Sequence, residues 1–227
     1  QLDPALNIVL TPNEVRVLGC LIEKEATTPD VYPLTLNSLL TACNQKSSRE
    51  PVMELNVDDV LAALDSLLGR TLAATWQSGH NRTAKYKHRL HDRISDKFSF
   101  SVPELAVLGT LFLRGPQTVG EIRTRCARIH EFGDLDQVAG VLKALEDNPD
   151  GPYVKMLPRQ EGRKEPRFIH LFCGEPEEIS VPVGTGSRST ARGESSRVEA
   201  LELQVSELKT ELQGLEQRLS QFMAQFD

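Results

Sequence analysis

The start of one predicted helix occurs twice in this chain, and this repeat indicates how the chain folds. Residues 11–21 read "TPNEVRVLGCL" and residues 101–111 read "SVPELAVLGTL", with five identities at an offset of 90. Each copy opens with Thr or Ser and has Glu three positions later, which is the capping box of a helix N-terminus. Each also carries a glycine in mid-helix, Gly19 or Gly109, at a cost of about 1 kcal/mol relative to alanine. We therefore expect both glycines to permit the close approach of another helix.

Two further segments repeat in the same order. Residues 35–43 ("TLNSLLTAC") parallel 118–126 ("TVGEIRTRC"), and residues 57–67 ("VDDVLAALDSL") parallel 135–145 ("LDQVAGVLKAL"). The offset shrinks from 90 to 83 and then to 78, so the first copy carries extra residues between its elements. Three ordered matches indicate a duplication. Besides Thr11 and Ser101, the expected helix caps are Thr35, Asn56 or Val57, Thr118 and Asp134.

After each third helix the apolar pattern changes to that of two strands and a turn. The first hairpin is predicted from residues 71–77 and 83–90, and the second hairpin from 153–159 and 166–172. Three helices followed by a two-stranded ribbon is the plan of a winged helix, which is a helix-turn-helix with a hairpin added. The predicted fold class is therefore mainly α with small β-hairpins (α+β).

We expect four regions along the chain. Residues 10–96 (the first copy) and 97–173 (the second copy) are predicted to be tandem winged-helix domains. Residues 174–196 are rich in Gly, Ser, Thr, Glu and Pro, which is typical of a flexible linker. Residues 197–227 are predicted to form a coiled-coil helix, because apolar residues alternate there in steps of three and four. These residues are Val198, Leu201, Val205, Leu208, Leu212, Leu215, Leu219, Phe222 and Phe226.

The coiled-coil segment, residues 198–226, has two possible partners. It could pack on the protein's own body, but a narrow stripe that follows a flexible linker favours a partner helix. We therefore expect a homodimer, or a complex with another protein, held through this segment.

Composition excludes several classes of protein. The formal charge of -6 argues against a protein that coats nucleic acid by charge alone. The sequence has no apolar run of the ~18 residues that a membrane span requires, and no signal-peptide pattern. Its four cysteines are widely spaced and include no C-x-x-C pair, which is typical of reduced thiols. We expect a cytoplasmic protein without membrane contact.

The first hairpin has the strongest charge pattern. Side chains alternate along a strand, so Lys85, Lys87 and Arg89 are predicted to lie on one face while Tyr86 faces the core. Together with Arg82 they could contact the phosphates of double-stranded DNA. The alternative is a solvated edge strand that its cations protect from aggregation.

The extra residues of the first copy precede its third helix. This insert, residues 43–55, reads "CNQKSSREPVMEL" and brings Asn44, Gln45, Lys46 and Arg49 close together. Such side chains can bind phosphates or base edges. The alternative is an ordinary loop between helices.

The third helices argue against simple major-groove recognition. They begin with Asp58 and Asp59 in the first copy and with Asp134 and Asp136 in the second. Carboxylates stabilise a helix N-terminus but repel phosphates. Acidic third helices suit a protein-interaction module better.

Enzymatic readings have little support. The sequence contains no nucleophile elbow, zincin motif or dinucleotide fingerprint. His88-x-x-His91 and His170-x-x-Cys173 could supply metal ligands, but neither matches a zinc-finger spacing. We expect no catalytic residues, no metal site and no cofactor.

The segments "TPDVYPLTLNSLLTACNQKSSREPVMEL" (residues 28–55) and "GRTLAATWQSGHNRTAKYKHRL" (residues 69–90) resemble the YceH-like bacterial proteins. The resemblance covers about residues 10–173 and implies a tandem winged-helix fold in a bacterial cytoplasm. It implies no activity. It does mark Tyr32-Pro33-Leu34 and residues 44–53 as a candidate site.

Two functional hypotheses follow. The leading one is a non-enzymatic DNA-binding protein, expected to be dimeric, in transcriptional regulation or chromosome maintenance. The alternative is a protein-protein interaction scaffold that uses its winged-helix domains and its coiled coil without touching nucleic acid.

Overall fold

A computed structural model describes residues 9–77, 83–91, 99–159 and 165–175. The chain divides into two units, Gln1–Glu177 and Glu178–Asp227, and every described residue belongs to the first. The predicted linker from residue 176 onward and the whole predicted coiled coil lie outside the described residues, as does Arg82.

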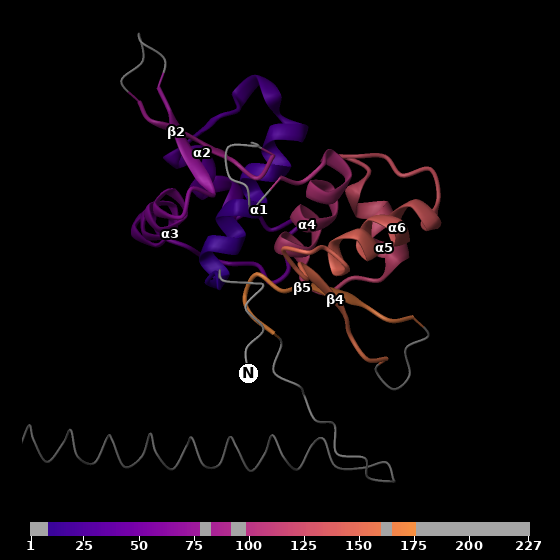
Figure 1. Cartoon of the computed structure of the whole chain (residues 1–227). Helices are drawn as coiled ribbons and strands as arrows, with labels where there is room; N and C mark the ends of the chain where they lie inside the picture. Colours follow the sequence, from indigo (N-terminus) through magenta and orange to yellow (C-terminus); the bar gives the residue numbers. More distant parts are fainter. Residues whose placement is uncertain (1–8, 78–82, 92–98, 160–164, 176–227) are drawn as a thin grey trace, which may run out of the picture. The chain divides into compact units, whose positions relative to one another are not determined.

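The first copy alternates helices with short strands (Figure 1). Its elements are α1 (Pro12–Thr27), the 3-10 turn η1 (Pro29–Val31), β1 (Leu34–Thr35), α2 (Leu36–Cys43), α3 (Val57–Gly69), β2 (Ala73–Trp76) and β3 (Lys85–His88). The strands form an antiparallel sheet in the order β1-β3-β2. Both hairpin strands are shorter than predicted, and β1 was not predicted at all.

The second copy repeats this order. Its elements are α4 (Val102–Arg114), α5 (Val119–Cys126), α6 (Leu135–Glu146), β4 (Val154–Met156) and β5 (Phe168–His170). Gln117 and Phe168 form an isolated antiparallel bridge at the place where β1 pairs with β3 through Leu34 and Tyr86 in the first copy. The prediction of helices with small antiparallel sheets is thereby confirmed. None of the described helices is long and apolar enough to cross a membrane.

The six α-helices among the described residues begin where the sequence predicts. In five of them the cap side chain accepts a backbone N–H of the first turn, which satisfies a donor that has no partner inside the helix. These caps are Thr11, Thr35, Asn56, Thr118 and Asp134. At Ser101 the carboxylate of Glu104 accepts both the backbone N–H and the hydroxyl.

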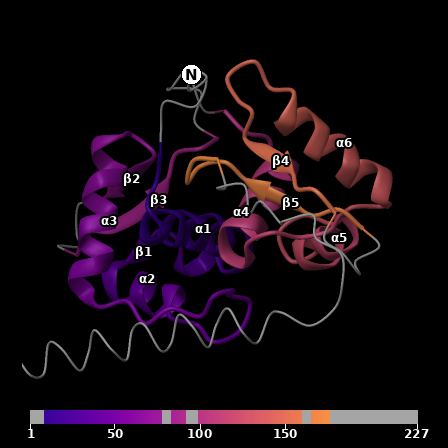
Figure 2. The same cartoon turned by 90° about the horizontal axis from the view of Figure 1, so that it is seen from below.

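The two copies join through α1 and α4, which lie side by side in both views (Figures 1 and 2). A Cβ built on Gly19 would lie 2.9 Å from Cβ of Phe112, and one built on Gly109 would lie 3.0 Å from Cγ2 of Ile22. The helices approach so closely that a methyl group at either position meets the opposite helix. The predicted role of the two glycines is confirmed.

Candidate functional site

The first hairpin separates its cations from its core side chains. Tyr86 packs against the hydrophobic core and His88 is fully buried. Because side chains alternate along a strand, Lys85 and Lys87 project from the opposite face of β3. Arg89 follows the strand, and its backbone N–H donates to the carbonyl of Leu72 at 2.9 Å. The strand register agrees with the predicted alternation of Lys85, Tyr86 and Lys87, whereas Arg89 lies just beyond the end of β3. Phosphate binding by these residues stays a prediction.

An aromatic side chain accompanies the cations. Trp76 pairs with Lys85 in the β2–β3 register and is 43% exposed. The Lys85 ammonium lies 6.0 Å from the centroid of the Trp76 ring, a cation–π distance. The hairpin therefore presents an exposed aromatic ring next to its lysines.

Arg49, predicted to reinforce the hairpin cations, lies in the interior. Its guanidinium donates to both carboxylate oxygens of Glu23, at 3.2 and 2.6 Å, and to the carbonyl of Ala42 at 3.1 Å. Burial opposes the charge on Arg49, but the hydrogen bonds with Glu23 outweigh it and raise the arginine pKa above its usual value. The structure corrects the expectation of a surface cation, because a phosphate could bind Arg49 only by displacing Glu23.

The two amides of the insert are also used internally. The side chain of Asn44 accepts from the backbone N–H of Leu55 and donates to the Leu55 carbonyl, each at 2.8 Å. The Gln45 carbonyl oxygen accepts from Arg49 at 3.1 Å. These bonds close the insert on itself, which corrects the expectation that Asn44 and Gln45 are directed toward bases. Lys46 is exposed, and its contact with phosphate stays a prediction.

A second buried arginine, which sequence analysis did not single out, also holds the insert. Arg16 is 2% exposed and donates to the carbonyls of Cys43, at 3.1 Å, and Pro51, at 2.5 Å. Burial lowers its pKa below the usual arginine value. The backbone N–H of Glu50 donates to the carbonyl of Leu113, so the insert is tied to α4 as well. Much of the segment that marks the family resemblance thus has a structural role.

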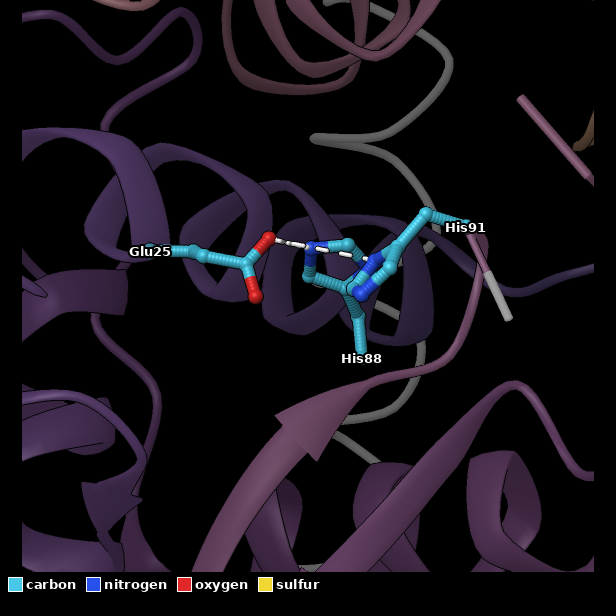
Figure 3. Close-up of side chains that lie close together, drawn as sticks. All are labelled: Glu25, His88 and His91. Atoms are coloured by element: carbon cyan, nitrogen blue, oxygen red, sulfur yellow. Dashed lines mark hydrogen bonds and ion pairs between the residues drawn. The ribbon is translucent and has the colours of Figure 1, made fainter. Parts of the chain in front are cut away.

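Three ionisable side chains meet behind the first hairpin (Figure 3). Glu25 comes from the last turns of α1, His88 from the end of β3, and His91 from the turn that follows. The Nε2 of His88 lies 2.7 Å from Oε2 of Glu25, and the Nδ1 of His91 lies 3.9 Å from the same oxygen. Tyr32, part of the other family-marking stretch, fixes this end of β3 because its hydroxyl accepts the His88 backbone N–H at 2.9 Å.

The electrostatics of this cluster favour an ionised carboxylate. Burial opposes ionisation of Glu25, but the hydrogen bond from His88 and the electrostatic contributions of His88, His91 and Lys87 outweigh it. The pKa of Glu25 therefore lies below its usual value. The sequence showed the His88-x-x-His91 spacing but gave no sign of Glu25, which is 63 residues from His88.

The acidic third helices use their carboxylates as caps. Asp59 accepts the backbone N–H of Asn56 at 2.9 Å, and Asp134 accepts that of Gln137 at 2.8 Å. Asp58 is exposed at the start of α3. Negative charge at this helix end disfavours a nearby phosphate.

The second hairpin lacks the cationic row of the first. Arg167 occupies the position of Lys85, but it donates to the Pro116 carbonyl at 3.0 Å and lies 3.5 Å from a Glu121 carboxylate oxygen. Ile169 and Leu171 occupy the positions of Lys87 and Arg89. Among the described residues, only the first hairpin presents two outward lysines on one strand.

Comparison with known proteins gives a consistent result. A family model described as "Protein of unknown function, DUF480" matches residues 10–163. The chain is 46% identical over 207 residues to the UPF0502 protein YceH of Salmonella paratyphi A (strain ATCC 9150 / SARB42), and equally to that of Salmonella newport (strain SL254). Each match covers 91% of this chain and 95% of the relative. The predicted resemblance is confirmed, and the names of these relatives state no ligand or reaction.

Proposed function

This chain belongs to the DUF480 family, and we propose that it binds double-stranded DNA through the phosphate backbone, with the first hairpin as the main contact. The observation that carries the proposal is the face of β3 that presents Lys85 and Lys87 beside the exposed ring of Trp76. Cations spaced along one strand face can follow a row of phosphates.

The fold supports this use of the hairpin. Each copy has the order helix, strand or bridge, two helices and hairpin, which supports the proposal that each is a winged helix with its hairpin as the wing. Residues 198–226, outside the described part of the chain, would join two molecules as a coiled coil. A dimer brings two first hairpins to one duplex, and the second contact then gains from effective concentration. We place this role in the bacterial cytoplasm.

Sequence preference is expected to be weak. Asn44 and Gln45 are engaged inside the insert, and α3 begins with carboxylates in place of base-reading side chains. Base edges are read mainly by Arg, Lys, Asn and Gln near the start of a recognition helix. Backbone contacts without such readers position a protein on DNA but carry little sequence information.

The test is a titration of the full chain into a fluorescently labelled random duplex, followed by anisotropy at several salt concentrations. The affinity is expected to fall steeply with salt. Each phosphate contact contributes about 0.9 to the slope of log K against log salt, so Lys85→Ala with Lys87→Ala should lower that slope by about two. The chain's single tryptophan, Trp76, gives a second signal, since DNA on this face should change its emission.

The matched control removes two cations from the second hairpin, by Lys155→Ala with Arg159→Ala, and changes the net charge equally. It should leave the affinity almost unchanged. Equal losses in the two double variants would mean that net charge alone governs binding, which contradicts the proposal. Absence of salt-sensitive binding would contradict it too and favour the scaffold hypothesis, since an apolar protein interface responds little to salt.

A further inference from the structure

The cluster of Glu25, His88 and His91 is not needed for phosphate binding, and its donor atoms have a chemistry of their own. One imidazole nitrogen from each histidine and one carboxylate oxygen lie within 4.8 Å of one another. Nitrogen together with carboxylate oxygen suits zinc and neighbouring transition metals, whereas magnesium and calcium prefer oxygen ligands alone. We infer that these three side chains bind one divalent transition-metal ion of the zinc type, with water completing its coordination.

The distances fit such an ion after small movements. Two ligand atoms at about 2.0 Å from a tetrahedral ion lie about 3.3 Å apart. The carboxylate oxygen of Glu25 is 2.7 Å from His88 Nε2 and 3.9 Å from His91 Nδ1, on either side of that value. In the view of Figure 3 the His88 ring lies between the Glu25 carboxylate and the His91 ring.

Of the three proposed ligands, the His88 side chain is held in place, whereas those of Glu25 and His91 have room to move. The His88 side chain has no exposed surface, and its backbone is held by Tyr32. The side chains of Glu25 and His91 are 37% and 42% exposed, so each can rotate toward an ion without disturbing the core. A partly preorganised site loses less conformational entropy on binding than three mobile side chains would.

One hydrogen bond opposes metal binding and limits its strength. The His88 Nδ1 accepts the backbone N–H of Leu90 at 3.3 Å, so the ring proton sits on Nε2 and is donated to Glu25. An ion needs the Nε2 lone pair, and the proton must then move to Nδ1, where Leu90 also presents a proton. The bond to Leu90 is long, and its loss is a modest cost. We expect binding weaker than that of a structural zinc site with four protein ligands.

The second copy provides an internal comparison. His170 stands at the position of His88, but Gly115 and Cys173 stand at the positions of Glu25 and His91. The carboxylate is therefore missing from the second copy, and no second group of three His, Cys, Asp or Glu ligands comes together in the described part of the chain. We expect one ion in that part.

The test is titration of metal-free full-length protein with Zn²⁺, by calorimetry and by competition with a chromophoric chelator. His91→Ala and Glu25→Gln should each raise the dissociation constant by about tenfold or more, since even an outer-shell partner is worth about 10–100-fold. His130→Ala, which removes a histidine of the second copy, should leave it unchanged. Circular dichroism of each variant confirms that it is folded, and the partly exposed positions of Glu25 and His91 make this the expected result.

Co²⁺ then identifies the donor atoms. The expected absorption spectrum lacks the near-ultraviolet charge-transfer band of a thiolate ligand, because the three proposed ligands are two histidine nitrogens and one carboxylate oxygen. Three outcomes would overturn the inference. These are no Zn²⁺ binding at about 100 μM metal, an affinity unchanged in both variants, or a thiolate band that places the ion on Cys173. None of them bears on DNA binding by the hairpin.

Discussion

In the first copy α1 buries Arg16 and Glu23 in addition to its capping residue Glu14, whereas Ala106 and Leu113 occupy the positions of Arg16 and Glu23 in α4 of the second copy. The two helices are otherwise alike, since each begins with a hydroxyl residue followed by a capping glutamate and each has a glycine at the same position. The difference accompanies the insert, which lies in the first copy alone.

An insert folded against buried helices brings carbonyl groups away from water, and each needs a donor. Arg16 supplies donors to Cys43 and Pro51, and Arg49 supplies one to Ala42. The second copy connects the equivalent helices by a shorter segment, where the exposed Arg123 donates to the carbonyls of Phe132 and Gly133. A conspicuously polar segment can therefore owe its polar side chains to the buried backbone groups that need hydrogen-bond partners inside the protein.

The largest effect is expected when Arg49, which pairs with Glu23 in the interior of the first copy, is removed. Arg49→Ala leaves the Glu23 carboxylate without its main partner, and loss of one member of a buried pair costs about 3–5 kcal/mol. Urea unfolding followed by circular dichroism measures the loss. A cost below about 1 kcal/mol, as for exposed ion pairs, would show that the buried pair of Arg49 and Glu23 contributes little to the stability of the fold.

A double variant tests whether the loss in Arg49→Ala comes from the unpaired charge of Glu23. Arg49→Met together with Glu23→Leu removes both charges and places at position 23 the residue that the second copy has at Leu113. It should recover part of the stability lost in Arg49→Ala, because no unpaired charge remains. Recovery stays incomplete, since the Ala42 carbonyl still lacks the donor that Arg49 supplied.

Acid should destabilise the protein through His170, the buried histidine of the second hairpin. Burial lowers the pKa of His170 to about 4 from the usual 6.5, and its Nδ1 is buried without a hydrogen-bond partner. Between these values the unfolded chain binds a proton that the folded chain does not, so acid favours unfolding. From neutral pH to about pH 4 the free energy of unfolding should fall by about 3 kcal/mol on account of this group.

The measurement compares the wild type with His170→Leu by urea unfolding across that pH range. The difference between them should shift by about 3 kcal/mol in favour of the variant as the pH falls. A difference that stays constant with pH would mean that His170 is protonated as readily in the folded chain as in the unfolded one.

The smallest effect is expected from a change at Gly19, which tests the close packing of α1 against α4. Gly19→Ala places a methyl group 2.9 Å from Cβ of Phe112, which is fixed to its backbone and cannot rotate away. The helices must separate, at about 1–3 kcal/mol. Gly140→Ala is the control, because its methyl meets nothing within 4 Å and should stabilise α6 by up to about 1 kcal/mol. Thermal unfolding should move in opposite directions, and a stabilised Gly19→Ala would contradict the close packing.

The sequence predicted the helices well because their signals are local. Thr11 with Glu14 and Ser101 with Glu104 mark helix starts within four residues. The strand β1 was missed because two residues leave no periodic pattern, and its pairing partner in β3 lies some fifty residues later. The predicted domain boundaries and coiled coil stay predictions.

The candidate site was harder to predict because its partners are distant in sequence. Arg49 was read as a surface cation, since nothing near it indicates Glu23, 26 residues earlier. One signal was available: Arg16, Cys20 and Glu23 are spaced four and three apart and share one face of α1. Apolar residues that are buried flank this face on both sides (Val17, Leu18, Leu21 and Ile22), so its charged side chains need partners inside the protein. The alternation of Lys85, Tyr86 and Lys87, by contrast, was readable directly.

The backbone N–H of Leu10 donates to the carbonyl of Phe172 at 2.6 Å, across 172 − 10 = 162 positions of the chain. On the ribosome α1 emerges before its neighbour α4, which follows about ninety residues later, and the Phe172 acceptor for Leu10 emerges later still. Contacts between segments so far apart in sequence are those that slow folding. The helix α1 is therefore fully enclosed long after it is made, and a nascent chain halted before Phe172 exposes apolar side chains of α1 that chaperones and proteases recognise.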